Sequence, residues 1–95
     1  MMSQAIQPDP NRKPTHPGAI LREVVLPELK ISQAALAKKL NLSPRMFANI
    51  IHERRSINAE VAISLEAHCG STAEQWMRLQ IAHDLWGARR SSHSK

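Results

Sequence analysis

The chain has 95 residues and a formal net charge of +5, which is enough for one small domain with a single hydrophobic core. Its sequence pI of about 10.2 favours an anionic partner. The single cysteine, Cys69, excludes an intrachain disulfide and a zinc site of several thiolates. No apolar run approaches the length of a membrane span, and residues 1–14 lack the apolar middle section of a secretion signal. We therefore expect a cytoplasmic protein without a membrane partner.

The two ends of the chain differ in composition from its middle. Pro8, Pro10 and Pro14 lie among polar and charged residues at the start, and such a segment cannot bury enough apolar surface to order itself. We predict a flexible N-terminal tail and a flexible C-terminal tail around one folded domain. The predicted bounds are 1–14, 89–95 and 15–88, respectively.

The first predicted helix begins at Pro17, because proline is tolerated at the first helical position. Four aliphatic residues at i, i+4 spacing form its buried stripe: Ile20, Leu21, Val24 and Val25. Pro27 should end the helix at Leu26, because the residue before a proline is pushed out of the helical region. His16 has no second metal ligand at suitable spacing, so we assign it a structural role.

Residues 32–51 predict a helix-turn-helix. Ser32 can cap a helix that starts at Gln33 and consists almost entirely of strong helix formers. Asn41 can enter the left-handed region and end this helix as a glycine would. Ser43 then caps a second short helix, with a proline at its first position. The two apolar stripes that should pack together across the turn are Leu36 and Leu40, then Phe47, Ile50 and Ile51.

This packing leaves Arg45, Met46 and Asn49 on the outer face of the second helix. Gln33 is exposed at the start of the first. Arginine can donate two bonds to guanine, asparagine can pair with adenine, and glutamine at a helix start can help to hold a phosphate. The pattern therefore favours DNA binding. A helical hairpin with a solvated polar face has the same pattern, so that alternative stays open.

A basic loop, which comprises residues 52–57, follows the second helix directly. Arg54 and Arg55 stand where the chain would pass a DNA backbone, and we predict that both contact phosphates. Positive charge gathers in and after the helix-turn-helix on Lys38, Lys39, Arg45, Arg54 and Arg55. Glu53 opposes it. A solvated basic face that serves solubility would carry the same charges, so the charge alone does not decide between the two interpretations.

A fourth helix is predicted from Ala59 to about Cys69. Asn58 is a good N-terminal cap, and Gly70 can end the helix. The apolar face is drawn from Val61, Ala62, Leu65 and Cys69. This spacing is typical of a helix that packs on a core with one side.

The fifth predicted helix is rich in apolar residues for the end of a small domain. Ser71 and Glu74 fit a capping box at its start, and we expect it to fray near Gly87. Docking on the chain's own core accounts well for Trp76, whereas Trp86 is harder to bury within one subunit. Part of this helix is therefore expected to face a second copy of the chain. The candidate dimer-interface residues are Trp76, Leu85 and Trp86.

The sequence offers no recognised catalytic constellation. Its histidines, scattered acids and Cys69 form no nucleophile with a base, no carboxylate pair and no metal set. His68 and Cys69 are adjacent, but neighbours in a helix point about a hundred degrees apart. We therefore expect no enzymatic activity, no cofactor and no metal site.

Three stretches carry a resemblance to a known family. They are the His-Pro-Gly opening of residues 16–23, the Ser-Gln-Ala-Ala-Leu-Ala stretch of residues 32–37, and the Trp-x-x-x-Gln and Asp-Leu pattern of residues 74–86. Together they resemble the HigA-type antitoxins of bacteria, which belong to the Cro/repressor, or XRE, group. The central stretch is shared by the whole group, whereas the opening and closing patterns are specific to the HigA type.

The resemblance implies an all-α fold, namely a five-helix lambda-repressor-like DNA-binding domain with a central helix-turn-helix. It implies a two-fold homodimer whose fifth helix contributes to the interface. The dimer would bind a palindromic double-stranded operator, repress its own operon, and neutralise a HigB-type toxin, a small basic ribonuclease that cleaves messenger RNA on the ribosome. By position, Ser43, Arg45, Met46 and Asn49 would face the major groove. Gln33, His52, Arg54 and Arg55 would contact phosphates.

Two other functions stay open at this point. The chain could be an orphan XRE-type transcriptional regulator without a toxin, or a protein-interaction module that has kept the fold and lost DNA binding. Arg45, Asn49 and the basic loop argue against the second of these. Two departures from the group affect the base readout: Asn41 replaces a common turn glycine, and Pro44 cannot donate a hydrogen bond.

Overall fold

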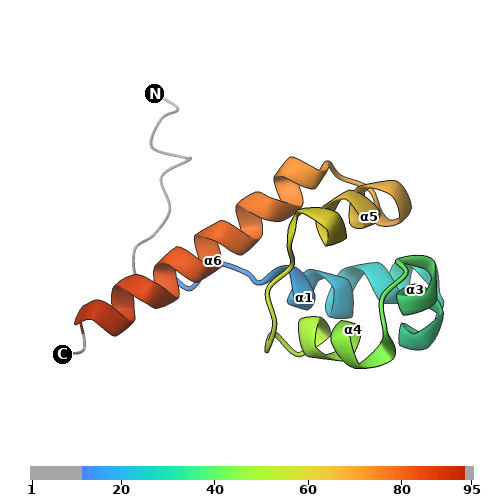
Figure 1. Cartoon of the computed structure of the whole chain (residues 1–95), viewed down its shortest axis with the longest axis horizontal. Helices are drawn as coiled ribbons and strands as arrows, with labels where there is room; N and C mark the ends of the chain where they lie inside the picture. Colours follow the sequence, from blue (N-terminus) through green and yellow to red (C-terminus); the bar gives the residue numbers. More distant parts are fainter. Residues whose placement is uncertain (1–11, 94–95) are drawn as a thin grey trace.

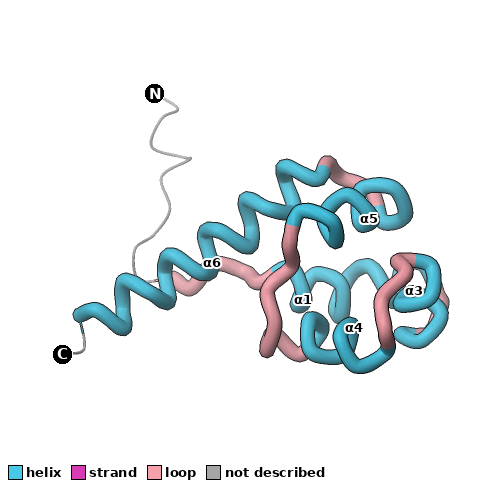
Figure 2. The backbone as a smooth tube through the Cα atoms, in the orientation of Figure 1, coloured by secondary structure: helices cyan, strands magenta, loops and turns pink. Residues whose placement is uncertain are grey.

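The computed structural model describes residues 12–93, with side chains to Ser91. Within this part the backbone forms five helices and no strand (Figures 1 and 2). The first helix comprises three continuous stretches: α1 (Pro17–Ile20), η2 (Leu21–Val25) and α2 (Leu26–Leu29). The others are α3 (Gln33–Lys39), α4 (Pro44–Ile51), α5 (Ala59–Cys69) and α6 (Ala73–His93). The expected all-α, five-helix fold is confirmed, whereas residues 1–11 of the predicted N-terminal tail lie outside the described part.

The first helix is longer than the sequence predicts. It continues through Pro27 and ends at Leu29, and the cap residue Lys30 is left-handed with a φ of 55°. The expected end at Leu26 is therefore wrong. Ahead of the proline the helix widens into a π-helical stretch, in which the Leu26 N–H donates to the carbonyl oxygen of Leu21, five residues back. The wider turn gives room to a proline ring that would clash with a carbonyl in a regular α-helix.

The buried stripe of this helix is narrower than predicted. Leu21 is fully buried and Val25 nearly so, whereas 47% of the Val24 surface is exposed. The expectation that Val24 is buried is wrong. Val24 lies inside the widened stretch itself, where the periodicity of a regular α-helix does not apply. Of the two predicted i, i+4 pairs, Leu21 and Val25 therefore face the core together, whereas Ile20 and Val24 do not.

The local signals of the helix-turn-helix are confirmed. Ser32 Oγ accepts a hydrogen bond from the Ala35 N–H at 3.0 Å, and Ser43 Oγ accepts one from the Met46 N–H at 3.1 Å. Asn41 has a φ of 61° in the turn. Both helix starts and the left-handed turn therefore follow from residues within a few positions of each boundary.

α5 is bounded as predicted, but the start of α6 is not. The Ser71 capping box is wrong, because Ser71 itself is left-handed with a φ of 61° and Thr72 accepts the N–H of Gln75 at 3.0 Å. The Ala73 N–H donates to Glu66 Oε1 on α5 at 2.6 Å. A carboxylate from the preceding helix thus satisfies one of the free N–H groups of α6.

α6 extends beyond its predicted end. It passes Gly87 and reaches His93, so the expected fraying near Gly87 is wrong and residues 89–93 of the predicted C-terminal tail are helical. A glycine costs a helix only about 1 kcal/mol relative to alanine. The Arg90 guanidinium lies 4.7 Å from the centre of the Trp86 ring and joins two successive turns. The C-terminal half of α6 stands apart from the other helices (Figure 1).

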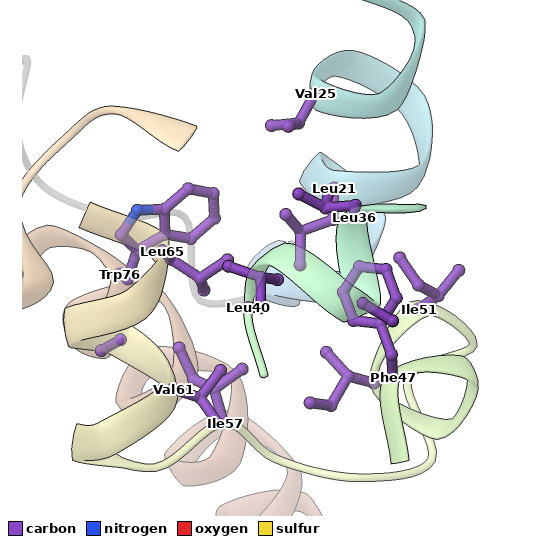
Figure 3. Packing of buried hydrophobic residues seen from close by; sticks show 13 residues of the cluster. Leu21, Val25, Leu36, Leu40, Phe47, Ile51, Ile57, Val61, Leu65 and Trp76 are labelled. Carbon is purple, nitrogen blue, oxygen red and sulfur yellow. The ribbon is translucent and has the colours of Figure 1, made fainter. Parts of the chain in front are cut away.

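One hydrophobic core joins all five helices (Figure 3). Trp76 is only 3% exposed inside it, and its Nε1–H donates to the carbonyl oxygen of Gly70 at 2.9 Å. Because its ring is buried within its own chain, Trp76 has little surface left for the predicted dimer interface. Ile57, the last residue of the basic loop, is also buried. It anchors the start of the connection to α5 in the core.

Candidate nucleic-acid interface

α3 and α4 form a packed unit that displays one side of α4. The two stripes predicted to meet are both buried, with at most 2% exposure. They consist of Leu36 and Leu40 on α3, and Phe47, Ile50 and Ile51 on α4. Because these residues fix the inner sides of both helices, the outer side of α4 is held in a defined orientation.

The outer side of α4 carries Arg45 and Asn49 one turn apart. Arg45 is exposed and Asn49 is partly exposed. Met46 is partly buried against the core, so its side chain is only partly on this outer side. Ser43 is exposed at the start of the helix, where its oxygen already caps the first turn. Gln33 lies at the start of α3 and is partly exposed.

Asn49 is paired with an arginine of the basic loop. Arg54 Nε donates to Asn49 Oδ1 at 3.3 Å, and the Arg54 backbone N–H donates to the Asn49 carbonyl oxygen at 2.8 Å. The sequence does not predict this pair. Because the side-chain oxygen already accepts one bond, the Asn49 amide N–H groups are left to donate outward. An amide that presents donors can serve the N7 and O6 acceptors of guanine as well as adenine N7.

The single acid of the basic loop is paired with an arginine of the first helix. Arg22 Nη2 contacts Glu53 Oε2 at 3.3 Å, and Arg22 Nη1 donates to the carbonyl oxygen of Ile51 at 2.6 Å. Arg22 therefore holds the last turn of α4 and shares its charge between Glu53 and Glu23, whose Oε2 lies 2.9 Å from the same nitrogen. His52, Arg54 and Arg55 are all exposed, so the outer charge of the loop is positive.

Arg22 is a site residue that sequence reasoning misses. It lies 29 residues before its Ile51 partner, and no local spacing connects the two positions. The only available signal is the Leu-Arg-Glu stretch within the opening pattern of residues 16–23.

Comparisons with known proteins identify the family. The helix-turn-helix family model matches residues 21–76. Virulence-associated protein I of Dichelobacter nodosus is 40% identical over 79 residues, which are 83% of this chain and 73% of that protein. The antitoxin GraA has a TM-score of 0.80 at 38% identity, over 85% of this chain and 87% of that one. The antitoxin HigA of Pseudomonas aeruginosa, solved with the higBA promoter, has a TM-score of 0.80 at 39% identity, over 86% of this chain and 89% of that one. This chain belongs to the HigA-type antitoxins of the helix-turn-helix family.

The structure explains the His-Pro-Gly opening of this HigA-type chain. His16 caps the first helix, because its Nδ1 accepts the N–H of Gly18 at 2.8 Å. Pro17 takes the first helical position, where no N–H is needed. A Cβ at Gly18 would overlap the carbonyl oxygen of Ile50. The motif therefore starts the helix and lets its backbone touch α4.

His16 also contacts α6. It is 3% exposed, and its ring meets that of His83 edge to face at a centroid distance of 4.8 Å. Burial, followed by the charge of His83, lowers the pKa of His16. Glu53, Asp84 and a backbone hydrogen bond at Arg55 oppose this shift. Because its Nδ1 accepts a bond from Gly18, the cap requires the form in which this nitrogen carries no proton.

The described residues provide little for other chemistry. No group of three or more His, Cys, Asp or Glu side chains among residues 12–93 could hold a metal ion. Burial raises the pKa of the Cys69 thiol, which disfavours the reactive thiolate. None of the helices in this part is both long and apolar enough to span a bilayer.

Proposed function

We propose that this HigA-type chain binds a palindromic operator as a homodimer, represses its own toxin-antitoxin operon and neutralises a HigB-type toxin, a small basic ribonuclease. One observation carries the DNA-binding part. α4 is fixed by the core on one side and presents Arg45 and Asn49 on the other, directly before the exposed arginines of the basic loop. The residues proposed to contact bases are thus followed directly by those proposed to contact phosphates.

In the proposed complex, α4 is the recognition helix and lies in the major groove. Arg45 is in its first turn, where a long side chain with two donors can reach guanine O6 and N7. Asn49 donates from its amide one turn further on, and Ser43 and Met46 line the approach to the bases. Gln33 holds a phosphate at the start of α3, in the position of the first helix of a helix-turn-helix.

The basic loop contacts the backbone of the same DNA segment. His52, Arg54 and Arg55 are exposed and follow the recognition helix without an intervening element. Glu53 lies among them, and its carboxylate is turned to Arg22 of the first helix. The net charge of +5 supports the same role, since each neutralised phosphate releases counterions and strengthens binding.

α6 supplies the proposed dimer interface. Ile81 is 51% exposed and Leu85 is 45% exposed on α6. Trp86, which is also predicted at the interface, is partly exposed. Exposed aliphatic residues gain from burial. A second copy packed on this part of α6 would bury Ile81 and Leu85.

Fluorescence anisotropy with DNA from upstream of the gene tests the operator part. We expect binding to an inverted repeat whose half-sites are about one helical turn apart, and weaker, strongly salt-dependent binding to a shuffled duplex. A single half-site should bind much more weakly than the repeat. Failure to bind any duplex at low salt would contradict the proposal and favour a protein-interaction module.

Affinity capture of the tagged chain from its native host, at near-physiological salt, tests the toxin part. Recovery of a small basic protein in stoichiometric amount, which then cleaves messenger RNA when freed, would support the antitoxin function. Recovery of the chain alone, with operator binding intact, would instead identify an orphan regulator. Both functions predict the same DNA complex, so only the presence or absence of the toxin distinguishes them.

A further inference from the structure

α6 is bonded directly to the end of the basic loop. Gln80 on α6 is 2% exposed, and its Oε1 accepts the backbone N–H of Ile57 at 2.8 Å. Its Nε2 donates to Asp84 Oδ1 at 2.9 Å. The other oxygen of Asp84 accepts from Ser56 Oγ at 3.4 Å. Two neighbouring residues of one helix face thus hold two successive residues of the loop.

The loop is fixed at its other end by the recognition helix. The Arg54 backbone N–H donates to the Asn49 carbonyl oxygen at 2.8 Å. Ile57 is buried in the core, next to Val61 in the close view (Figure 3). Arg54, Arg55 and Ser56 are all exposed between these anchors, so packing alone does not determine their conformation. The hydrogen bonds from α6 therefore restrain the conformation of this part of the loop.

We infer that Gln80 and Asp84 are positioning residues for DNA binding, which set the backbone of the basic loop so that Arg54 and Arg55 face phosphates before DNA arrives. The inference rests on the proposed operator binding and extends it to a helix that makes no DNA contact in that proposal. A loop held in its bound conformation loses less conformational entropy on binding than a loose one. A buried amide that accepts the N–H of Ile57 and is itself held by a carboxylate is suited to this role.

The charge of Asp84 makes the inference testable. A carboxylate beside the basic loop repels phosphates, so its removal should strengthen DNA binding if charge alone mattered. A positioning role predicts the opposite for a substitution that removes the oxygens. Asp84 is suitable for such a test because 51% of its side chain is exposed, so the fold should tolerate the change.

The experiment compares Asp84→Ala and Asp84→Asn with wild type by fluorescence anisotropy on the operator, at several salt concentrations. We expect Asp84→Ala to raise Kd by about three- to tenfold, the effect of ordering one or two side chains on binding. The salt dependence should become shallower. Asp84→Asn keeps an oxygen for Gln80 and loses the charge, so its Kd should equal or fall below the wild-type value. Glu28→Ala, which removes an exposed carboxylate on α2, is the matched control and should leave Kd unchanged.

Hydrogen exchange of the free protein supplies a second measurement. In Asp84→Ala the amide of Ile57 should exchange faster, while that of Leu65 in the core stays protected. An Asp84→Ala variant that binds the operator as tightly as wild type, or more tightly, would overturn the positioning role even with operator binding intact. A wild-type chain that binds no DNA would overturn the proposed function itself. The two failures are therefore distinguishable.

Discussion

Gly18 lies directly against the backbone carbonyl oxygen of Ile50, so the first helix and α4 meet backbone to backbone. The contact places the start of one helix on the last turn of the other. Arg22, one turn further along, donates to the carbonyl oxygen of the next residue, Ile51. The C-terminal end of the proposed recognition helix is thus held by two residues of the first helix, one through shape and one through a hydrogen bond.

Gly18→Ala should destabilise the fold by about 1–3 kcal/mol, because the added methyl group meets a backbone atom that no rotamer change can move away. Gly87→Ala is a matched control. A Cβ there meets no atom within 4 Å, and the helix gains about 1 kcal/mol from the better helix former. Chemical denaturation of both variants measures the free energies of unfolding. Equal effects of the two substitutions would contradict the close contact.

The stability of the fold should decrease as the pH falls below about 6.5, the ordinary pKa of histidine. Burial lowers the pKa of His16 in the folded chain, so the unfolded chain binds a proton at a higher pH than the folded one. The contribution is complete above the unfolded pKa and is lost as the pH falls towards the folded value. Thermal unfolding between about pH 7.5 and pH 5 measures the effect.

His16→Asn is the control for this pH dependence. Asparagine is a good N-terminal cap and does not titrate, so the variant should keep the start of the helix while its melting temperature varies less with pH. An unchanged pH dependence in His16→Asn would assign the effect to other groups.

Signals that act within a few residues of one another predict much of this fold. Ser32 and Ser43 cap the two helices of the helix-turn-helix, and Asn41 makes the left-handed turn, as the sequence predicts. Each of these outcomes depends on side chains that bond to the next turn of the same chain. The order and number of helices follow from such signals together with apolar spacing.

Contacts between residues far apart in the chain explain where the predictions from the sequence differ from the structure. The choice of Thr72 over Ser71 as the cap of α6 accompanies a bond from Glu66 on the preceding helix. Trp76 is buried in its own core, although apolar spacing cannot distinguish this from a dimer interface. Pro27 remains inside a helix because η2 widens ahead of it, which single-residue rules do not anticipate. Arg22 and Gln80 make polar contacts with residues far away along the chain, and no spacing in the sequence indicates those contacts.

Arg45→Ala and Arg54→Ala should affect DNA binding in different ways. Loss of Arg45 should weaken operator binding by about 1–3 kcal/mol and relax the sequence preference, because a base contact is removed. Loss of Arg54 should weaken binding to all DNA sequences by the same factor and reduce the slope of log Kd against log salt by about one. Anisotropy titrations on operator and shuffled duplexes at several salt concentrations separate these effects.

Arg54→Lys is the matched variant for the loop. It keeps a positive charge for the phosphate but loses the Nε–H that binds Asn49 Oδ1. We expect a salt dependence close to that of wild type and, as in Arg54→Ala, no change in sequence preference. Identical behaviour of the Arg45 and Arg54 alanine variants would contradict the division between base and phosphate contacts.

Leu85→Glu should dissociate the proposed homodimer. The side chain is 45% exposed on the protruding half of α6, and a two-fold interface carries every substitution twice. Loss of its buried area in both copies, together with two buried charges, should weaken the dimer by at least about 3 kcal/mol. Ile63→Glu on α5 changes an even more exposed aliphatic residue, at 62%, and should leave the dimer intact. Analytical ultracentrifugation measures the dimer affinity of both variants. Operator affinity should decrease only in Leu85→Glu, because only this variant loses the dimer. If both variants remain dimers, the interface lies elsewhere than on this half of α6.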